Sequence, residues 1–286
     1  MDLSFDHVYT AYRTIVSPNE GVLPPHPGPS WTRFVCISDT HSHTEDAFKD
    51  QIPSGDFLLH SGDLSSWGKL SQLRKTVDWI GGLEGFEYKV LIAGNHDFCL
   101  DAQSSMYDGQ LPETVKKCLE EAQELMRGEE ARAKGIIYLE YEQIALKTKV
   151  GREWILYGSP AAPRYADGAF QYTNRVEAKA ISSLIPSDVE ILLTHTPAHG
   201  ILDWARRGRH AGCESLLERL GKLSKLHLHV FGHIHESKGA QIVPLRPGAG
   251  IYAIPEVERP KRLEWVAVNA AMLAVQGPAI VVDLMN

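Results

Sequence analysis

The sequence has 286 residues, of which 43% are hydrophobic and 23% are charged, and its formal net charge is −7. This composition is typical of a soluble globular protein, and no segment approaches the ~18 consecutive apolar residues of a membrane span. The negative charge disfavours nucleic acid as a partner, because a phosphate backbone repels an acidic surface.

The start of the sequence lacks the basic and apolar segments of a secretory signal, so we expect a cytoplasmic protein. The cysteines at 36, 99, 118 and 213 show no CxxC spacing and predict no disulfide framework. Residues 1–32 are rich in proline, which blocks regular helix and indicates an extended lead-in. The remaining residues, 33–286, are long enough for one α/β domain.

Short apolar runs and helical patterns alternate along the first part of the chain. FVCIS (34–38), DFLLH (56–60) and YKVLIA (88–93) predict strands, and a helix is predicted over 70–83, where Leu73, Val77 and Ile80 share one face. Residues 101–135 form a polar insertion in which apolar residues recur at helical spacing after Pro112. We interpret this insertion as a helix packed on the flank of a sheet, with a substrate lid as the alternative.

Many strand-like runs follow the insertion. They read GIIYLE, QIALK, REWILYG, VEILLT, LHLHVF, QIVPL, IYAIP, LEWVAVN and AIVVDL. So many strands with only a few helices indicate an α/β fold in which two sheets pack together and helices lie outside them.

Five polar clusters each come directly after one of the apolar runs. They are Asp39-Thr40-His41, Gly62-Asp63, Gly94-Asn95-His96-Asp97, Thr194-His195 and Gly232-His233-Ile234-His235. Strand ends of this kind would deliver the side chains to one edge of a sheet, where they form a rigid site.

The clusters contain seven candidate metal ligands, which are Asp39, His41, Asp63, Asn95, His195, His233 and His235. Residues i and i+2 of a strand point to the same side, so the first and last clusters would each offer two ligands. His233 and His235 could each bind a different metal, or both could bind the same metal. Mixed nitrogen and oxygen ligands without sulfur suit two divalent ions such as Mn, Fe, Zn or Co better than Ca or Mg.

His96 is not needed as a ligand and is free to act as a catalytic acid. An imidazolium that protonates the leaving oxygen of a phosphate ester typically contributes about 10²–10⁴-fold. We expect Asp97 to hold the ring of His96 and to raise its pKa. Two metals ~3.5–4 Å apart would activate a bridging hydroxide for in-line attack on phosphorus.

Four further polar residues have weaker assignments. His60 is interpreted as a core histidine or as a group that supports a ligand. His43, His199 and Arg164 are candidate substrate contacts, with solvated loop residues as the alternative interpretation.

The motifs D-x-H, GD, GNHD, H and GHxH resemble those of the calcineurin-like metallophosphoesterase superfamily, over roughly residues 33–235. The resemblance implies a four-layer αββα sandwich of two mixed β-sheets flanked by helices, with His96 as the catalytic histidine. It also implies one metal at Asp39, His41, Asp63 and His235, and a second at Asp63, Asn95, His195 and His233.

Segments such as CISDTHS, LLHSGD, YKVLIAGNHD, HTPAHGILDW, LHVFGHIHE and VNAA look like the MPPED branch, which is related to class III cyclic nucleotide phosphodiesterases. We expect a binuclear phosphodiesterase that takes a small phosphodiester or nucleotide as its partner. A low-activity nucleotide-binding sensor or scaffold of the same fold is the alternative. A protein Ser/Thr phosphatase is disfavoured, because LSSWG follows Asp63 where those enzymes carry VDRG and its phosphate-gripping arginine.

Overall fold

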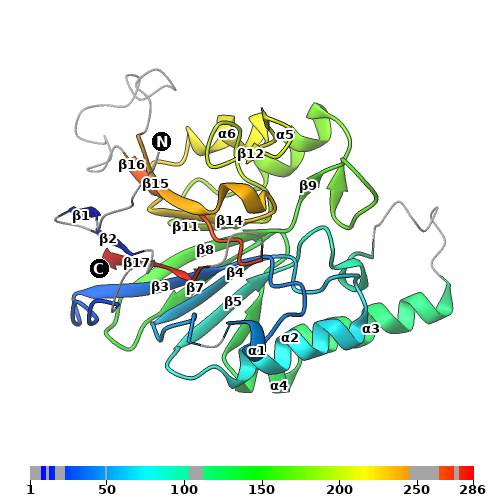
Figure 1. The fold of residues 1–286 in the computed structure, drawn as a ribbon, viewed down its shortest axis with the longest axis horizontal. Helices are drawn as coiled ribbons and strands as arrows, with labels where there is room; N and C mark the ends of the chain where they lie inside the picture. Colours follow the sequence, from blue (N-terminus) through cyan, green and yellow to red (C-terminus); the bar gives the residue numbers. More distant parts are fainter. Residues whose placement is uncertain are drawn as a thin grey trace.

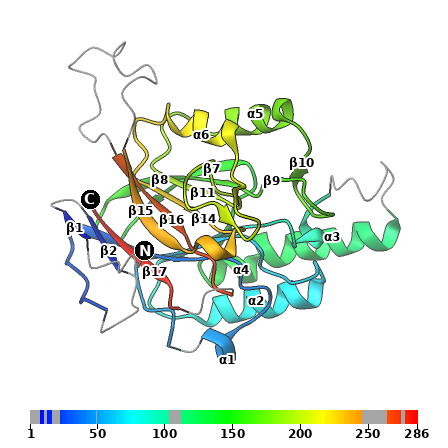
Figure 2. The same ribbon diagram turned by 45° about the horizontal axis from the view of Figure 1, so that its top comes forward.

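A computed structural model describes residues 8–10, 13–16, 23–48, 50–102, 112–244, 264–273 and 277–286. Two β-sheets pack face to face, and helices cover the outer face of each sheet (Figures 1 and 2). The architecture is therefore the four-layer αββα sandwich, and the predicted fold class is confirmed.

The first sheet has seven strands in the order β1-β2-β17-β3-β4-β5-β6. Their bounds are β1 (Val8–Thr10), β2 (Arg13–Val16), β17 (Ile280–Met285), β3 (Trp31–Ile37), β4 (Phe57–Ser61), β5 (Tyr88–Ile92) and β6 (Ile136–Tyr138). Strands β3 to β6 run parallel, whereas β17 is antiparallel to both β2 and β3. The proline-rich lead-in thus contributes two strands to this sheet.

The second sheet has six strands in the order β15-β16-β14-β11-β8-β7. Their bounds are β15 (Gly239–Pro244), β16 (Glu264–Asn269), β14 (Leu228–Phe231), β11 (Ile191–Thr194), β8 (Glu153–Ser159) and β7 (Glu142–Lys147). The four inner strands are parallel and the two edge strands are antiparallel to them. The strand predicted at 251–255 lies outside the described residues.

Two short pairs of strands lie outside the main sheets. Strands β9 (Ala162–Pro163) and β10 (Gln171–Tyr172) are parallel, and β12 (Trp204–Ala205) and β13 (Arg209–His210) form an antiparallel hairpin.

The apolar runs are buried on both faces because each sheet lies between the other sheet and a helical layer. On β3, Phe34 and Cys36 belong to the core between the sheets, whereas Val35 and Ile37 belong to the core under the helices. The ring of Phe34 meets Trp154 of β8 edge-on, with 5.4 Å between ring centroids. This two-sided burial explains why the strands appear as continuous apolar runs and not as alternating patterns.

The helices divide between the two outer faces (Figure 1). The first sheet is covered by α1 (Glu45–Phe48), α2 (Leu70–Gly82), α3 (Glu113–Arg127) and α4 (Glu129–Ala133), and the second by α5 (Arg175–Ser183) and α6 (Glu214–Leu220). Helix α2 matches its prediction. Helix α3 buries Leu119, Ala122 and Met126, so this part of the insertion is packed on the flank of the sheet as predicted. Residues 103–111 of the insertion lie outside the described part of the chain.

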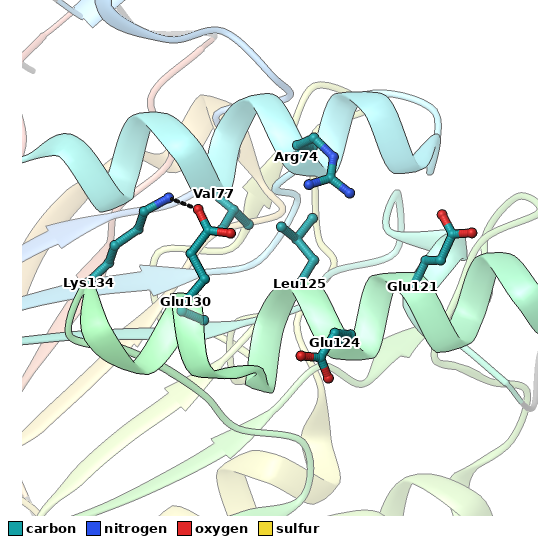
Figure 3. Close-up of a pocket in the computed structure, with 8 residues that line it drawn as sticks. Arg74, Val77, Glu121, Glu124, Leu125, Glu130 and Lys134 are labelled. Carbon is teal, nitrogen blue, oxygen red and sulfur yellow. Dashed lines mark hydrogen bonds and ion pairs between the residues drawn. The ribbon is translucent and has the colours of Figure 1, made fainter.

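A cavity of about 280 Å³ lies between α2, α3 and α4 (Figure 3). Its wall includes Arg74, Glu121 and Glu124, and it ends at an ion pair of 2.7 Å between Lys134 Nζ and Glu130 Oε1. No candidate ligand is among the described residues that line it. This charged cavity belongs to the outer helical layer and not to the predicted site.

A buried ion pair connects β3 to β17. Arg33 Nε and Nη2 donate to the two carboxylate oxygens of Asp283 at 2.7 and 2.8 Å, and Arg33 Nη1 donates to the carbonyl of Pro24 at 3.1 Å. Both charged side chains are almost completely buried. The pair therefore fixes β17 and the lead-in to the first parallel strand.

Replacing Asp283 by alanine is expected to lower the free energy of unfolding by ~3–5 kcal/mol, because the Arg33 guanidinium would remain buried without its counter-charge. Urea denaturation measures this loss. The double variant Arg33→Met/Asp283→Leu is the control, and it should recover most of the stability because no unpaired charge remains. Equal unfolding midpoints for Asp283→Ala and the unmodified protein would contradict the role of the pair.

Candidate metal centre

Five strands bring the predicted clusters to one edge of the sandwich. Strands β3, β4 and β5 are parallel neighbours in the first sheet, and β11 and β14 are parallel neighbours in the second. The loops that carry Asp39, Asp63 and Asn95 follow the first three strands, and those that carry His195 and His233 follow the other two. Because the sheets pack face to face, the five loops meet at the same end of the molecule.

The first group of candidate ligands is compact. The ligand atoms of Asp39, His41, Asp63 and His235 all lie within 4.8 Å of one another. His235 Nε2 is 2.9 Å from Asp39 Oδ1, and His41 Nε2 is 3.6 Å from Asp63 Oδ2. These distances suit four donors around one cation.

A second group shares Asp63 with the first. His195 Nε2 lies 3.4 Å from Asp63 Oδ1 and 2.9 Å from Asn95 Oδ1. The ring of His233 packs against that of His195, with 5.0 Å between centroids. His235 therefore belongs to the first group of candidate ligands and His233 to the second, and Asp63 is common to both groups.

The backbone at this edge is left-handed, which corrects one step of the sequence argument. Asp39, His41, Asp63 and His233 have φ values of 54°, 47°, 54° and 65°. Asp39 and His41 thus do not share a face through strand geometry, as predicted, because the chain has already left β3 and turns tightly. Left-handed non-glycine residues cost of order 1–3 kcal/mol each and persist where the surroundings hold them.

Backbone amides and glycines hold these strained turns. The N–H of His233 donates to both carboxylate oxygens of Asp39 at 3.1 and 3.0 Å, and that of His96 donates to Asp63 Oδ1 at 2.9 Å. A Cβ atom on Gly232 would lie only 1.9 Å from Asp39 Oδ2. Glycine is therefore required before His233, since any side chain there would displace the carboxylate.

The charges of the site favour a bound cation. Burial, together with the neighbouring charges of Asp39 and Asp97, raises the pKa of Asp63 well above its ordinary value. Burial lowers the pKa of His41 to about 4 and that of His233 to about 3, so both imidazoles are neutral near pH 7. Neutral imidazole is the form that ligates metals, and a divalent ion would relieve the repulsion between the carboxylates.

The hydrogen bonds of His195 test whether the site suits a metal ion. Burial lowers the pKa of His195, and its Nδ1–H donates to the carbonyl of Ser61 at 2.9 Å. The lone pair of Nε2 then faces the oxygen of Asn95 at 2.9 Å, so two electron-pair donors meet without a proton between them. A carbonyl that accepts from one ring nitrogen and an unprotonated lone pair on the other are typical of a metal-ligating histidine. The residues fit divalent cations.

Comparison with known proteins agrees with this geometry. A sequence model described as calcineurin-like phosphoesterase matches residues 32–237. The chain belongs to this family. The family resemblance inferred from the motifs is therefore confirmed, and the metal-ligand chemistry of the site is that of a metallophosphoesterase.

Several proteins are similar in sequence or structure to this chain. Human metallophosphoesterase domain-containing protein 1 is 35% identical over 220 residues, which cover 74% of this chain but only 63% of the human protein. UPF0046 protein K07C11.7 of Caenorhabditis elegans is 30% identical over 237 residues, covering 81% of this chain and 74% of that protein. A crystal structure of a dimetal phosphatase from Danio rerio aligns with a TM-score of 0.41 at 12% identity, covering 88% of this chain and 91% of that one.

His96 lies beside the candidate metal ligands and is partly exposed. Its ring meets that of His41 edge-on at 4.7 Å, and its Nδ1–H donates to the carbonyl of Ser66 at 2.7 Å. The predicted contact between Asp97 and this ring is therefore wrong, because the Ser66 carbonyl already occupies the inner ring nitrogen. Its other nitrogen is the one available to a substrate.

Asp97 instead joins two loops of the site. Its completely buried carboxylate accepts hydrogen bonds from the backbone N–H groups of Leu64, Ser65 and Gly94, and from the Ser65 hydroxyl, at 2.7–3.1 Å. These contacts fix the loop that follows Asp63 to the loop that carries Asn95 and His96. Asp97 therefore supports the site by holding the backbone of these two loops and not by contacting His96.

Replacing Asp97 by alanine is expected to lower the free energy of unfolding by at least ~3 kcal/mol, because three buried N–H groups lose their acceptor. Urea denaturation measures the loss. Asp97→Asn is the matched variant, and it should lose less because its amide oxygen still accepts. Equal midpoints for Asp97→Ala and the unmodified protein would show that the two loops do not depend on this residue.

The weaker assignments have mixed outcomes. His60 is completely buried, and its Nε2 is 2.9 Å from the Thr40 hydroxyl, so it is a core histidine beneath the site as predicted. His43 is exposed. Arg164 pairs with Asp167 at 3.4 Å beside the cavity at the start of α5. His199 is 4.0 Å from Asp203. Contact of these residues with substrate remains a prediction.

Sequence reasoning missed three groups that support the site. The Ser66 and Ser61 carbonyls orient His96 and His195, and backbone groups of this kind leave no signal in a sequence. Asn269 donates through Nδ2 to the carbonyls of Leu202 and Ile234 at 3.1 and 2.9 Å. The only signal for Asn269 in the sequence is its place in the VNAA segment, which resembles the MPPED branch.

Proposed function

We propose that this phosphoesterase is a binuclear, metal-dependent phosphodiesterase that hydrolyses small phosphodiesters, including cyclic nucleotides. The observation that carries the proposal is the position of His96 at the edge of the ligand cluster. It packs on His41, and its inner ring nitrogen is held by a backbone carbonyl. A partly exposed histidine held in this way is suited to transfer a proton to a leaving oxygen.

Two divalent ions, drawn from Mn, Fe, Zn and Co, complete the proposal. Asp39, His41, Asp63 and His235 would hold one ion, and Asp63, Asn95, His195 and His233 the other. When bound, such ions supply an activated water and neutralise phosphate oxygens. The short distances within both groups support this division of the ligands.

The residues of the chain have separate tasks in the proposed reaction. Asp63, whose carboxylate contacts both ligand groups, would contribute a ligand oxygen to each of the two ions. Asn95 adds a ligand oxygen without adding negative charge. His96 donates a proton to the leaving oxygen as the ester bond breaks, and the Ser66 carbonyl keeps its ring in the orientation that this transfer requires.

A diester fits this site better than a phosphoprotein monoester. The loop after Asp63 reads Leu64-Ser65-Ser66-Trp67-Gly68 and contributes no arginine to grip a phosphate dianion. Ser65 and Ser66 are instead engaged with Asp97, His96 and His41, so their polar groups serve the loop itself. We therefore favour a singly charged phosphodiester as the substrate.

Hydrolysis of bis-p-nitrophenyl phosphate tests the proposal. Protein reconstituted separately with Mn, Fe, Zn and Co is expected to release p-nitrophenol with at least one metal, and a chelator should abolish the release. Absence of turnover with every metal, on this diester and on 2′,3′- and 3′,5′-cyclic nucleotides, would overturn it. Nucleotide binding without turnover would then favour a sensor or scaffold.

We also propose that the protein acts in the cytoplasm. All four cysteines are free, which is the usual state in a reducing compartment. Among the helices that the structure describes, none is both long enough and apolar enough to cross a membrane.

A further inference from the structure

The β12–β13 hairpin is fixed to the loop that carries the metal ligand His235. The hydroxyl of Ser237 donates to the carbonyl of Trp204 at 2.9 Å, and Arg206 Nε pairs with Glu236 Oε1 at 2.7 Å. The side-chain amide of Asn269 bridges the chain just before the hairpin to the loop of His235. The hairpin therefore keeps a defined position beside the metal centre.

The hairpin presents an aromatic ring to solvent. Trp204 is 54% exposed, although tryptophan usually buries most of its surface. Its ring is held edge-on by the ring of His210, with 4.9 Å between centroids and 80° between planes. One face of a rigid indole is thus available for a flat ligand.

A buried carboxylate holds this arrangement. Asp203 is 1% exposed, and its Oδ1 accepts from His210 Nδ1 at 2.5 Å. Its Oδ2 accepts from the backbone N–H groups of Gly200 and Gly212 at 3.0 and 2.9 Å. With Nδ1 engaged in this way, Nε2 is the nitrogen of His210 that can contact a ligand. Asp203 thus fixes the exposed ring of His210, and that ring contacts Trp204, which suits the pair of rings to recognition of a ligand.

The charge of the hairpin favours a phosphate-bearing ligand. Arg207 and Arg209 lie within it, in addition to Arg206, whose charge Glu236 offsets, whereas the whole chain carries a net charge of −7. A local basic segment beside a metal centre attracts anions, and interleaved aromatic rings add stacking to that attraction. A nucleotide combines the two features, since it joins an anionic phosphate to a flat base.

We infer that the β12–β13 hairpin determines specificity by binding the base of a nucleotide whose phosphate lies at the metal centre. Trp204 stacks on the base, His210 contacts its edge through Nε2, and the arginines favour the anionic ligand. This inference rests on the proposed function for the position of the phosphate. Asp203 is a positioning residue that acts through His210.

Binding to the metal-loaded full-length protein tests the inference without requiring turnover. Calorimetry compares adenosine 5′-phosphate with ribose 5-phosphate, which lacks only the base. The unmodified protein is expected to bind the nucleotide about 5- to 150-fold more tightly, the range for one base stacked on an aromatic ring. Trp204→Ala should bring the two affinities together by weakening nucleotide binding alone.

Two further variants sharpen the comparison. Trp204→Phe keeps an aromatic ring and should retain most of the preference for the nucleotide. Val176→Ala, at a side chain 79% exposed on α5, is the surface control and should bind as the unmodified protein does. Thermal melting of each variant checks that it is folded. Equal affinities for the two ligands in the unmodified protein, or an unchanged preference in folded Trp204→Ala, would overturn the inference.

Failure of this inference is distinguishable from failure of the proposed function. Turnover of bis-p-nitrophenyl phosphate together with equal affinities would retain the phosphodiesterase and exclude the hairpin as its base-binding element. Preference for the nucleotide that depends on Trp204, without turnover of any diester, would retain the hairpin and exclude the enzyme.

Discussion

Replacing Asp63 by asparagine is expected to lower kcat/KM for bis-p-nitrophenyl phosphate by at least about 10³-fold, since metal ions contribute several kcal/mol to the stabilisation of transition-state charge. Asp63 is the residue whose carboxylate contacts both ligand groups, at 3.6 Å from His41 and 3.4 Å from His195. Elemental analysis should show about two ions per chain in the unmodified protein and one or none in the variant.

The same substitution should stabilise the metal-free protein. The pKa of Asp63 is raised in the folded protein by burial and by the charges of Asp39 and Asp97. Above the ordinary aspartate pKa, Asp63 therefore ionises more easily in the unfolded chain, and this ionisation lowers the stability of the fold. The metal-free variant should therefore melt at a higher temperature at pH 7, and the difference should shrink as the pH falls towards ~4, where unfolded aspartate also becomes protonated.

Asp78→Asn is the matched control for Asp63, because Asp78 is an exposed aspartate on α2 that pairs only loosely with Lys134, at 3.4 Å. It should alter neither metal content nor turnover. Full metal content in Asp63→Asn would contradict the assignment of Asp63 as the bridging ligand. A lower melting temperature for its metal-free form would contradict the electrostatic argument.

Replacing His96 by alanine is expected to reduce kcat for a cyclic nucleotide by about 10²–10⁴-fold, the usual contribution of a general acid. Metal content should stay at the level of the unmodified protein, because His96 lies outside both ligand groups. The loss should be smaller for bis-p-nitrophenyl phosphate, since p-nitrophenolate leaves readily without a proton. Steady-state kinetics on the two substrates measures the difference.

His26→Ala provides the control, since His26 lies in the lead-in and pairs with Asp56, just before β4 and not at the ligand edge. It should leave both rates unchanged. Equal losses on the two substrates in His96→Ala would indicate that His96 positions the ester and does not protonate it. A fall in metal content would instead assign it to the metal centre.

The sequence predicted the position of the site because its ligands follow strands, and a buried parallel strand is visible as an apolar run. Asp39, Asp63 and His195 could be placed at one edge on that ground alone. The turn geometry was not visible. Asp39 and His41 reach the same group of candidate ligands through left-handed backbone. Hydrogen bonds to residues far away in the sequence maintain that backbone.

Predictions of hydrogen-bond partners failed where backbone groups compete with side chains. Asp97 is adjacent to His96 in the sequence, yet its carboxylate turns to three N–H groups, and a serine carbonyl takes the ring. Asn269 likewise joins two loops that are far apart along the chain. Such contacts depend on how the two sheets pack, and no local pattern of residue types contains that information.

The place of β17 in the first sheet has a consequence for biosynthesis. Its ladder to β3 joins residues about 250 positions apart, whereas every candidate ligand lies between 39 and 235. At ~5–20 residues per second, a ribosome needs a few seconds to add the segment between the last ligand and β17. During that interval a nascent chain already carries all the candidate ligands, while the edge of β3 that β17 later covers is still open to pairing with another strand.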